Sequence, residues 1–152
     1  MEFIKADLCT FLDVIANLKE NQKPVWGKMS AQRMIEHLTD SIRMSCGLEN
    51  NELQIPEEKI ERMQAFLLSD KPMAQNIQVS FAKENTPLRN SDMELAIDEF
   101  TTAWVDFEEM YTENNKKIEL HPHYGNLNYK LWLCLHSKHF THHFNQFGLI
   151  QN

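Results

Sequence analysis

Apolar side chains recur every three or four positions along most of this 152-residue chain, and only four glycines and five prolines interrupt the pattern. That spacing is the period of an α-helix and differs from the alternation expected of a strand. We therefore predict an all-α fold built from long amphipathic helices. An apolar content of 42% and nine phenylalanines supply enough material for one core, so residues 1–152 are expected to form a single domain.

Four main helices follow from the apolar stripes and from residues that favour helix ends. They run from Phe3 to about Lys19, from Ala31 to about Cys46, from Ser91 to about Asn114, and from Asn128 to Gly148. Ser30 and Asn128 are placed as N-caps, and Ser91–Glu94 has the capping-box pattern. Four such helices bury their stripes by packing together, which predicts a four-helix bundle.

The stretch between Leu48 and Asn90 gives mixed signals. Pro56 predicts the start of a short helix that ends near Leu68, whereas Pro72 and Pro87 bracket a segment that is irregular or extended. We interpret this stretch as an irregular insertion between the second and third main helices.

Four of the seven histidines lie within eight residues of the last predicted helix. On a helical wheel His136, His139 and His143 share one inward sector, and His142 points to a neighbouring face. Imidazole is a common ligand for zinc, nickel and copper. We predict that His139 and His143 bind one divalent metal ion, with His37 of the second helix as the third ligand. Three nitrogen ligands leave coordination positions open for water and substrate, as in catalytic sites.

These histidines also have a simpler explanation. Solvated or paired imidazoles are common near the C-terminus of a helix, where histidine suits the helix dipole. Burial of three imidazoles without an ion or partner would cost about 1 to 3 kcal/mol for each unsatisfied nitrogen, and an ion removes that cost. Accidental capture of nickel or zinc by the cluster is a third explanation.

Further candidates for proton transfer or substrate contact are His136, His142, His123 and Tyr124. The last two belong to the segment His121–Gly125, which leads into the last helix. That segment is equally well explained as a Pro/Gly turn with an aromatic anchor.

Charge and hydropathy exclude several classes of partner. The formal charge is −7 and no stretch is rich in Lys or Arg, so we expect no binding to nucleic acid. No apolar run approaches the roughly 18 residues of a membrane span, and the N-terminus lacks the pattern of a signal peptide. We therefore expect a cytoplasmic protein that acts on a small molecule and does not bind membranes.

Three segments carry a resemblance to a known family: Trp26–Leu38, His121–Leu127 and Lys138–Gly148. In order and spacing they resemble the DinB/YfiT-like superfamily of four-helix-bundle metalloproteins, in particular a bacterial branch of unknown function. The most specific part is one histidine in the second helix combined with a His-x-x-His-His-x-x-Gln run in the last.

This resemblance implies a DinB-like bundle of up-down-down-up topology and a divalent metal, usually zinc or nickel, held by His37, His139 and His143. Members with known activity include thiol-dependent S-transferases and a maleylpyruvate isomerase, which use the metal to activate a low-molecular-weight thiol. A homodimer is also frequent. Where the superfamily often has Arg-Gly, this chain has Phe144-Asn145, and this departure leaves the three histidines in place.

We therefore expect a metal-dependent enzyme, S-transferase-like or hydrolase-like, that activates a small thiol or water for attack on a small-molecule substrate. Two alternatives stay open. One is a non-catalytic module that binds metal and ligand, and the other is a metal-free helical module that dimerises. Copurification of metal and formation of product distinguish the three.

Overall fold

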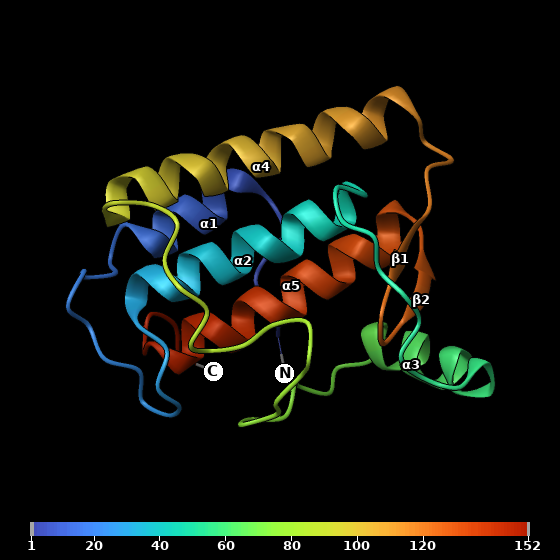
Figure 1. Cartoon of the computed structure of the whole chain (residues 1–152), viewed down its shortest axis with the longest axis horizontal. Coiled ribbons are helices and arrows are strands. Elements are labelled where there is room, and N and C mark those ends of the chain that lie inside the picture. The colour runs from blue at the N-terminus through green and yellow to red at the C-terminus, as the bar shows by residue number, and fades with distance from the viewer. Residues whose placement is uncertain (1, 152) are drawn as a thin grey trace.

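The computed structural model describes residues 2–151 and contains, within that range, five α-helices and one β-hairpin (Figure 1). The helices are α1 (Leu8–Ile15), α2 (Ala31–Ser45), α3 (Ile60–Leu67), α4 (Met93–Glu113) and α5 (Tyr129–Gln146). A 3-10 turn, Glu57–Lys59, precedes α3. The hairpin pairs β1 (Glu119–His121) with β2 (Gly125–Leu127) in antiparallel register.

The prediction of an all-α, four-helix up-down-down-up bundle was wrong. The described residues contain five α-helices and a two-stranded sheet between α4 and α5. The fifth helix is α3, the short helix that was predicted to follow Pro56 within the insertion. The hairpin escaped prediction because its strands have three residues each, too few to show an alternating pattern. Helices dominate the fold nevertheless, in agreement with the period of the apolar residues.

Polar side chains at the helix ends explain where the long helices begin. Ser30 accepts a hydrogen bond from the backbone of Arg33, and Asn128 accepts one from Leu131, as predicted. At α4 the cap is Asp92, one residue later than the predicted Ser91. The first helix is much shorter than expected, because Asp7 caps it and Leu8 is its first residue.

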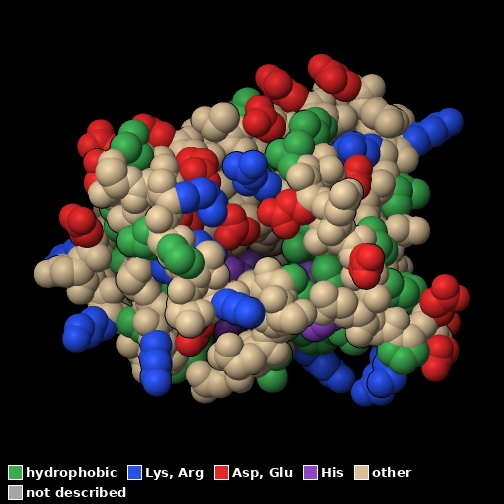
Figure 2. Space-filling model, in the orientation of Figure 1, with side chains coloured by type: hydrophobic (Ala, Val, Ile, Leu, Met, Phe, Trp, Pro, Cys, Tyr) green, Lys and Arg blue, Asp and Glu red, His purple; other side chains and the backbone are tan. Residues whose placement is uncertain are grey.

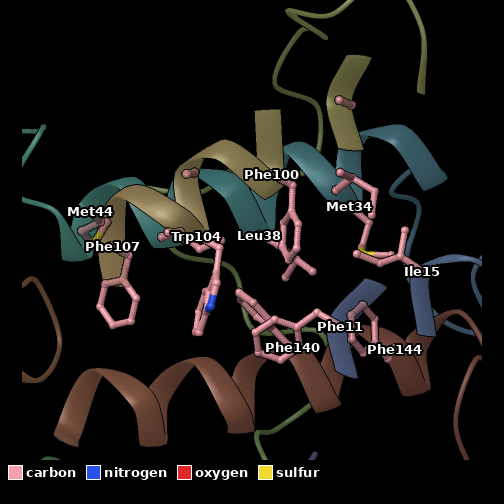
Figure 3. Close-up of a cluster of buried hydrophobic side chains, with 14 of the residues drawn as sticks. Phe11, Ile15, Met34, Leu38, Met44, Phe100, Trp104, Phe107, Phe140 and Phe144 are labelled. Carbon is pink, nitrogen blue, oxygen red and sulfur yellow. The ribbon is translucent and has the colours of Figure 1, made fainter. Parts of the chain in front are cut away.

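The core lies where α2 faces α4 and α5, with α1 closing one side (Figure 3). Its centre is aromatic: the ring of Phe11 from α1 meets Phe100 and Trp104 of α4 and Phe140 of α5 edge to face, at centroid distances of 4.8 to 6.2 Å. Such contacts add to the stabilisation that comes from burial of apolar area. This aromatic centre joins α1, α4 and α5.

The hairpin is fastened to the insertion. The side-chain amide of Gln64 in α3 donates hydrogen bonds to the carbonyl oxygens of Tyr124 and Asn126, at 2.9 and 3.0 Å. Gly125 has a φ of +70°. A Cβ atom at this position would lie only 3.0 Å from the side chain of Ile60. Only glycine suits both that conformation and that close approach. The hairpin and α3 therefore form one structural unit at one end of the main helices (Figure 1).

The rest of the insertion, between α3 and α4, crosses in front of α5 (Figure 1). Lys138 of α5 is buried, and its ammonium donates to the carbonyl oxygens of Ser69 and Lys71. Near the start of α4, Arg89 forms ion pairs with Asp40 of α2 and Glu99 of α4. Both ends of the crossing segment are thus tied to the main helices. Within residues 2–151, none of the helices has the length and apolar character that a membrane crossing requires.

Candidate metal centre

Three histidines meet where the middle of α2 faces the second half of α5. His37 comes from α2, and His139 and His143 stand one turn apart on α5. Residues four apart on a helix lie on the same face, so the two α5 side chains are aligned by local structure alone. One nitrogen of each ring lies within 4.8 Å of the others. The structure therefore brings together the three histidines that the sequence indicated.

The rings point their Nε2 atoms at one another. The His139 Nε2 atom lies 2.9 Å from that of His37 and 3.0 Å from that of His143. The ring planes are steeply inclined to one another, at 74° to 81°. Such an arrangement directs three ring nitrogens toward a common point, as the ligands of a single ion are directed.

The tautomer of His143 is defined by Gln146. The amide nitrogen of Gln146 donates to the carbonyl oxygen of Trp26 at 3.0 Å, so its oxygen faces His143. That oxygen lies 2.7 Å from His143 Nδ1, which must therefore carry the proton and donate it. The Nε2 atom of His143 is left with a lone pair directed at the other two histidines. Outer hydrogen bonds of this kind orient metal-binding histidines.

Burial keeps these imidazoles neutral. Desolvation is the main cause that lowers the pKa of all three, to about 4 for His37 and well below the usual value for His139 and His143. The nearby Arg33 lowers the pKa of His37 further. A metal ion binds the neutral form of imidazole, so the site is in the state that favours binding.

The donor set fits a divalent ion such as zinc. Four-coordinate zinc with bonds of ~2.0 to 2.1 Å spaces its nitrogen ligands about 3.3 Å apart. The two short distances of 2.9 and 3.0 Å need to open only slightly to reach that spacing. Without a cation, a proton on the Nε2 atom of His139 can form a hydrogen bond to only one of its two neighbours. The other pair of Nε2 atoms is then left with lone pairs that face each other. Among the described residues no carboxylate or thiol joins the three histidines.

A cavity of about 630 Å³ opens beside the cluster. All three histidines line it, and Figure 2 shows histidine side chains at the bottom of a recess that acidic and basic side chains border. Its apolar walls come from α3, the crossing segment and α5: Met63, Phe66, Met73, Phe81 and Leu135. The volume is that of a typical small-molecule site.

Three of the four further candidate residues also line this cavity: His142, His123 and Tyr124. The ring of His142 lies edge-on to Trp26 at 5.7 Å. His123 and Tyr124 belong to the hairpin turn, and burial raises the pKa of the Tyr124 hydroxyl to about 12. The segment is thus a hairpin turn with an aromatic side chain, and it also places polar groups in the cavity wall. Both explanations of this segment therefore stay open.

His136 lies elsewhere. It has no exposed surface, does not line the cavity, and is enclosed by aromatic rings of α4 and α5. Its Nε2 atom is 3.1 Å from the hydroxyl of Ser45, and burial lowers its pKa to about 3. The structure therefore gives His136 a place in the core and does not bring it to the three-histidine cluster.

Two cavity residues had not been selected from the sequence, namely His121 and Arg33. Both are more than nine-tenths buried. His121 ends β1, and the signal that could have found it is the turn Pro122–Tyr124 followed by Gly125, a spacing typical of a three-residue hairpin. Arg33 lies on α2 one turn before His37, and nothing in the sequence distinguishes it from an exposed arginine.

Comparison with known proteins identifies one family. A family model described as "Protein of unknown function (DUF1569)" matches residues 2–148. No match was found among curated proteins or among solved structures. The family match spans α1 to α5 and includes every residue of the three-histidine cluster and the cavity. On this evidence the chain belongs to the DUF1569 family.

Proposed function

We propose that this protein is a divalent-metal-dependent enzyme whose metal, zinc or nickel, is held by His37, His139 and His143. The observation that carries the proposal is the convergence of three neutral imidazoles on one point, with the outer nitrogen of His143 held by Gln146. The likeness of the histidine pattern to the DinB/YfiT-like superfamily supports the same assignment.

The reaction follows from what an ion on three nitrogens supplies. A divalent ion held by the three histidines would lower the pKa of a water or thiol and so supply a nucleophile at neutral pH. The cavity beside the histidines holds the small-molecule substrate, and its apolar walls exclude bulk water from the reacting atoms. His142, His123 and Tyr124 are the candidate substrate contacts, because their side chains line the same space.

Elemental analysis of protein purified without a histidine tag tests the metal site. We expect about one zinc or nickel ion per chain, lost in both His37→Ala and His139→Ala, because two nitrogens bind an ion far more weakly than three. His142→Ala is the matched control, since His142 is next to His143 in sequence but outside the cluster. A native chain that holds no ion after incubation with zinc and desalting would contradict the proposal.

The choice between a thiol and water is tested by activity. The metal-loaded protein is assayed against small electrophiles with and without a low-molecular-weight thiol. Turnover that depends on the thiol indicates an S-transferase, and turnover in its absence indicates a hydrolase. A protein that binds metal but gives no product in either case would favour a non-catalytic binding role.

A further inference from the structure

His121 is an enclosed side chain that the metal cluster does not use. It is 7% exposed and packs against the rings of Phe81, Tyr124 and Trp132, with centroids 4.7 to 5.7 Å away. These contacts hold the imidazole in place at the end of β1, in the cavity wall. A side chain held this firmly can present a hydrogen-bonding group in a defined position.

The free nitrogen of His121 is a donor. The backbone N–H of His123 donates to His121 Nδ1 at 3.0 Å, so Nδ1 has no proton. Burial lowers the pKa of His121 to about 3, with a smaller contribution from His123, so the ring is neutral near pH 7. In a neutral ring whose Nδ1 is an acceptor, the proton is on Nε2. Within residues 2–151 that N–H has no hydrogen-bond partner.

Three further donor atoms of cavity-lining residues lack a hydrogen-bond partner, and unlike the Nε2 atom of His121 they have almost no accessible surface. They are Nε1 of Trp26 and two guanidinium nitrogens of Arg33. No side-chain oxygen of the described cavity residues is both enclosed and unpartnered. A ligand in the cavity cannot reach these three atoms as they stand, whereas an oxygen acceptor on a ligand can pair with the Nε2–H of His121.

The charges favour an uncharged acceptor. Arg33 is already paired with Asp40, at 2.7 Å, and lies 3.9 Å from the carboxylate of Glu36. Two residues of the cavity lining are basic, Arg33 and Arg62, and three are acidic, Asp40, Glu49 and Glu84. Positive charge is therefore not in excess. Methionine, phenylalanine and leucine side chains supply much of the apolar part of the lining. Because acidic side chains outnumber basic ones in this lining, a carbonyl oxygen on an uncharged molecule can accept the hydrogen bond from His121 without adding a further negative charge there.

We propose that the cavity binds small, largely apolar molecules with an uncharged carbonyl group, and that the Nε2–H of His121 donates a hydrogen bond to the carbonyl oxygen. The inference rests on the proposed function, because it names the substrate class of the same site. His121 is then a substrate-contact residue: it orients the carbonyl and draws electron density toward its oxygen, which favours attack by a nucleophile at the carbon.

A pair of probes of nearly equal shape tests this hydrogen bond. Acetophenone has a carbonyl oxygen where α-methylstyrene has a CH2 group, and both are unreactive with water under mild conditions. Binding of each is measured by ligand-observed NMR titration, for the native chain and for His121→Phe, which keeps an aromatic ring and removes the donor. We expect the substitution to weaken acetophenone binding roughly tenfold, the value of about one lost hydrogen bond, and to leave α-methylstyrene binding unchanged.

His121→Gln is the second variant, because it retains an N–H group at the end of the side chain and should keep part of the acetophenone affinity. It also serves if His121→Phe does not fold, as judged by circular dichroism. Equal effects on both probes, no effect on acetophenone, or no measurable binding of acetophenone by the native chain would each overturn the inference.

The titrations are run on metal-free protein, prepared with a chelator, and on zinc-loaded protein. If His121→Phe weakens the binding of acetophenone alone but the protein takes up no zinc, the proposed metal site is overturned and the carbonyl contact stands. If the protein takes up zinc but His121→Phe changes the affinities for the two probes equally, the carbonyl contact is overturned and the metal site stands.

Discussion

Gln146 shows how much of the candidate site depends on one side chain. Its amide oxygen accepts from His143 Nδ1, and its amide nitrogen donates to the carbonyl oxygen of Trp26. It thereby fixes which nitrogen of His143 faces the cluster, and it ties the end of α5 to the loop before α2. The backbone hydrogen bond from Val25 to the carbonyl oxygen of Gln146, at 2.7 Å, reinforces the same connection.

Replacement of Gln146 by leucine should weaken zinc binding by roughly 10- to 100-fold, since loss of the outer hydrogen bond frees the ring orientation and the tautomer of His143. Zinc affinity is measured by competition with a chelator of known affinity. Asn145→Ala is the matched control, because Asn145 is the neighbouring amide and has no side-chain hydrogen bond to the cluster. Equal affinities for the native chain and Gln146→Leu would contradict a role for Gln146 in orienting His143.

At the scale of the elements, the crossing segment is held over α5 by Lys138. The ammonium donates to two backbone carbonyls of the segment, 2.9 Å from Ser69 and 2.5 Å from Lys71, and it also lies over the rings of Phe3 and Phe66. The segment supplies part of the cavity wall, including Met73 and Phe81. One buried cation on α5 therefore positions a wall that has little regular structure of its own.

Lys138→Met keeps the length of the side chain but removes both hydrogen bonds. We expect a loss of about 1 to 3 kcal/mol in the free energy of unfolding, because the carbonyl oxygens of Ser69 and Lys71 both lose their charged donor. Amide hydrogen exchange should rise mainly within residues 69–90. Lys130→Met is the control, as Lys130 lies on the same helix and is exposed. Uniform exchange changes along the chain would argue against an anchoring role for Lys138.

For the whole molecule, buried histidines make stability depend on pH. Burial lowers the pKa of His136 and His121 from 6.5 to about 3, and that of His37 to about 4. Below pH 6.5 the unfolded chain takes up protons that the folded chain does not. The free energy of unfolding therefore falls as the pH drops from 6.5 toward 3 to 4, and this loss is absent above pH 6.5.

Urea unfolding of metal-free protein at pH 7.5, 6 and 5 measures this dependence. His136→Phe keeps an aromatic ring in the aromatic enclosure and removes one titrating group, so the loss between pH 6 and 5 should be smaller by up to about 1.4 kcal/mol per pH unit. A native chain that becomes more stable as the pH falls below 6.5 would contradict neutral buried histidines.

Local sequence determined most of the helices, because their signals are local. Ser30 and Asn128 cap α2 and α5 through contacts with residues three positions on, and apolar spacing identifies the buried faces. The pairing of His139 with His143 is local in the same sense, because it needs only one turn of helix. Their role as metal ligands, with His37, stays a prediction from the residue types and from the resemblance.

Four features could be learned only from the tertiary structure: the presence of the hairpin, the tautomer of His121, the burial of Arg33 and the location of His136 in the core. The wheel put His136 in the same inward sector as His139 and His143, yet it lies among Trp104, Phe107 and Trp132, apart from the cavity. A helical wheel shows which way a side chain faces, but not everything it meets, since Trp104 and Phe107 come from α4, which is distant in sequence. By itself the sequence determined the helical period and the chemistry available on each face, because both depend on near neighbours. The cavity and its donors depended on contacts between distant segments, which only the folded chain brings together.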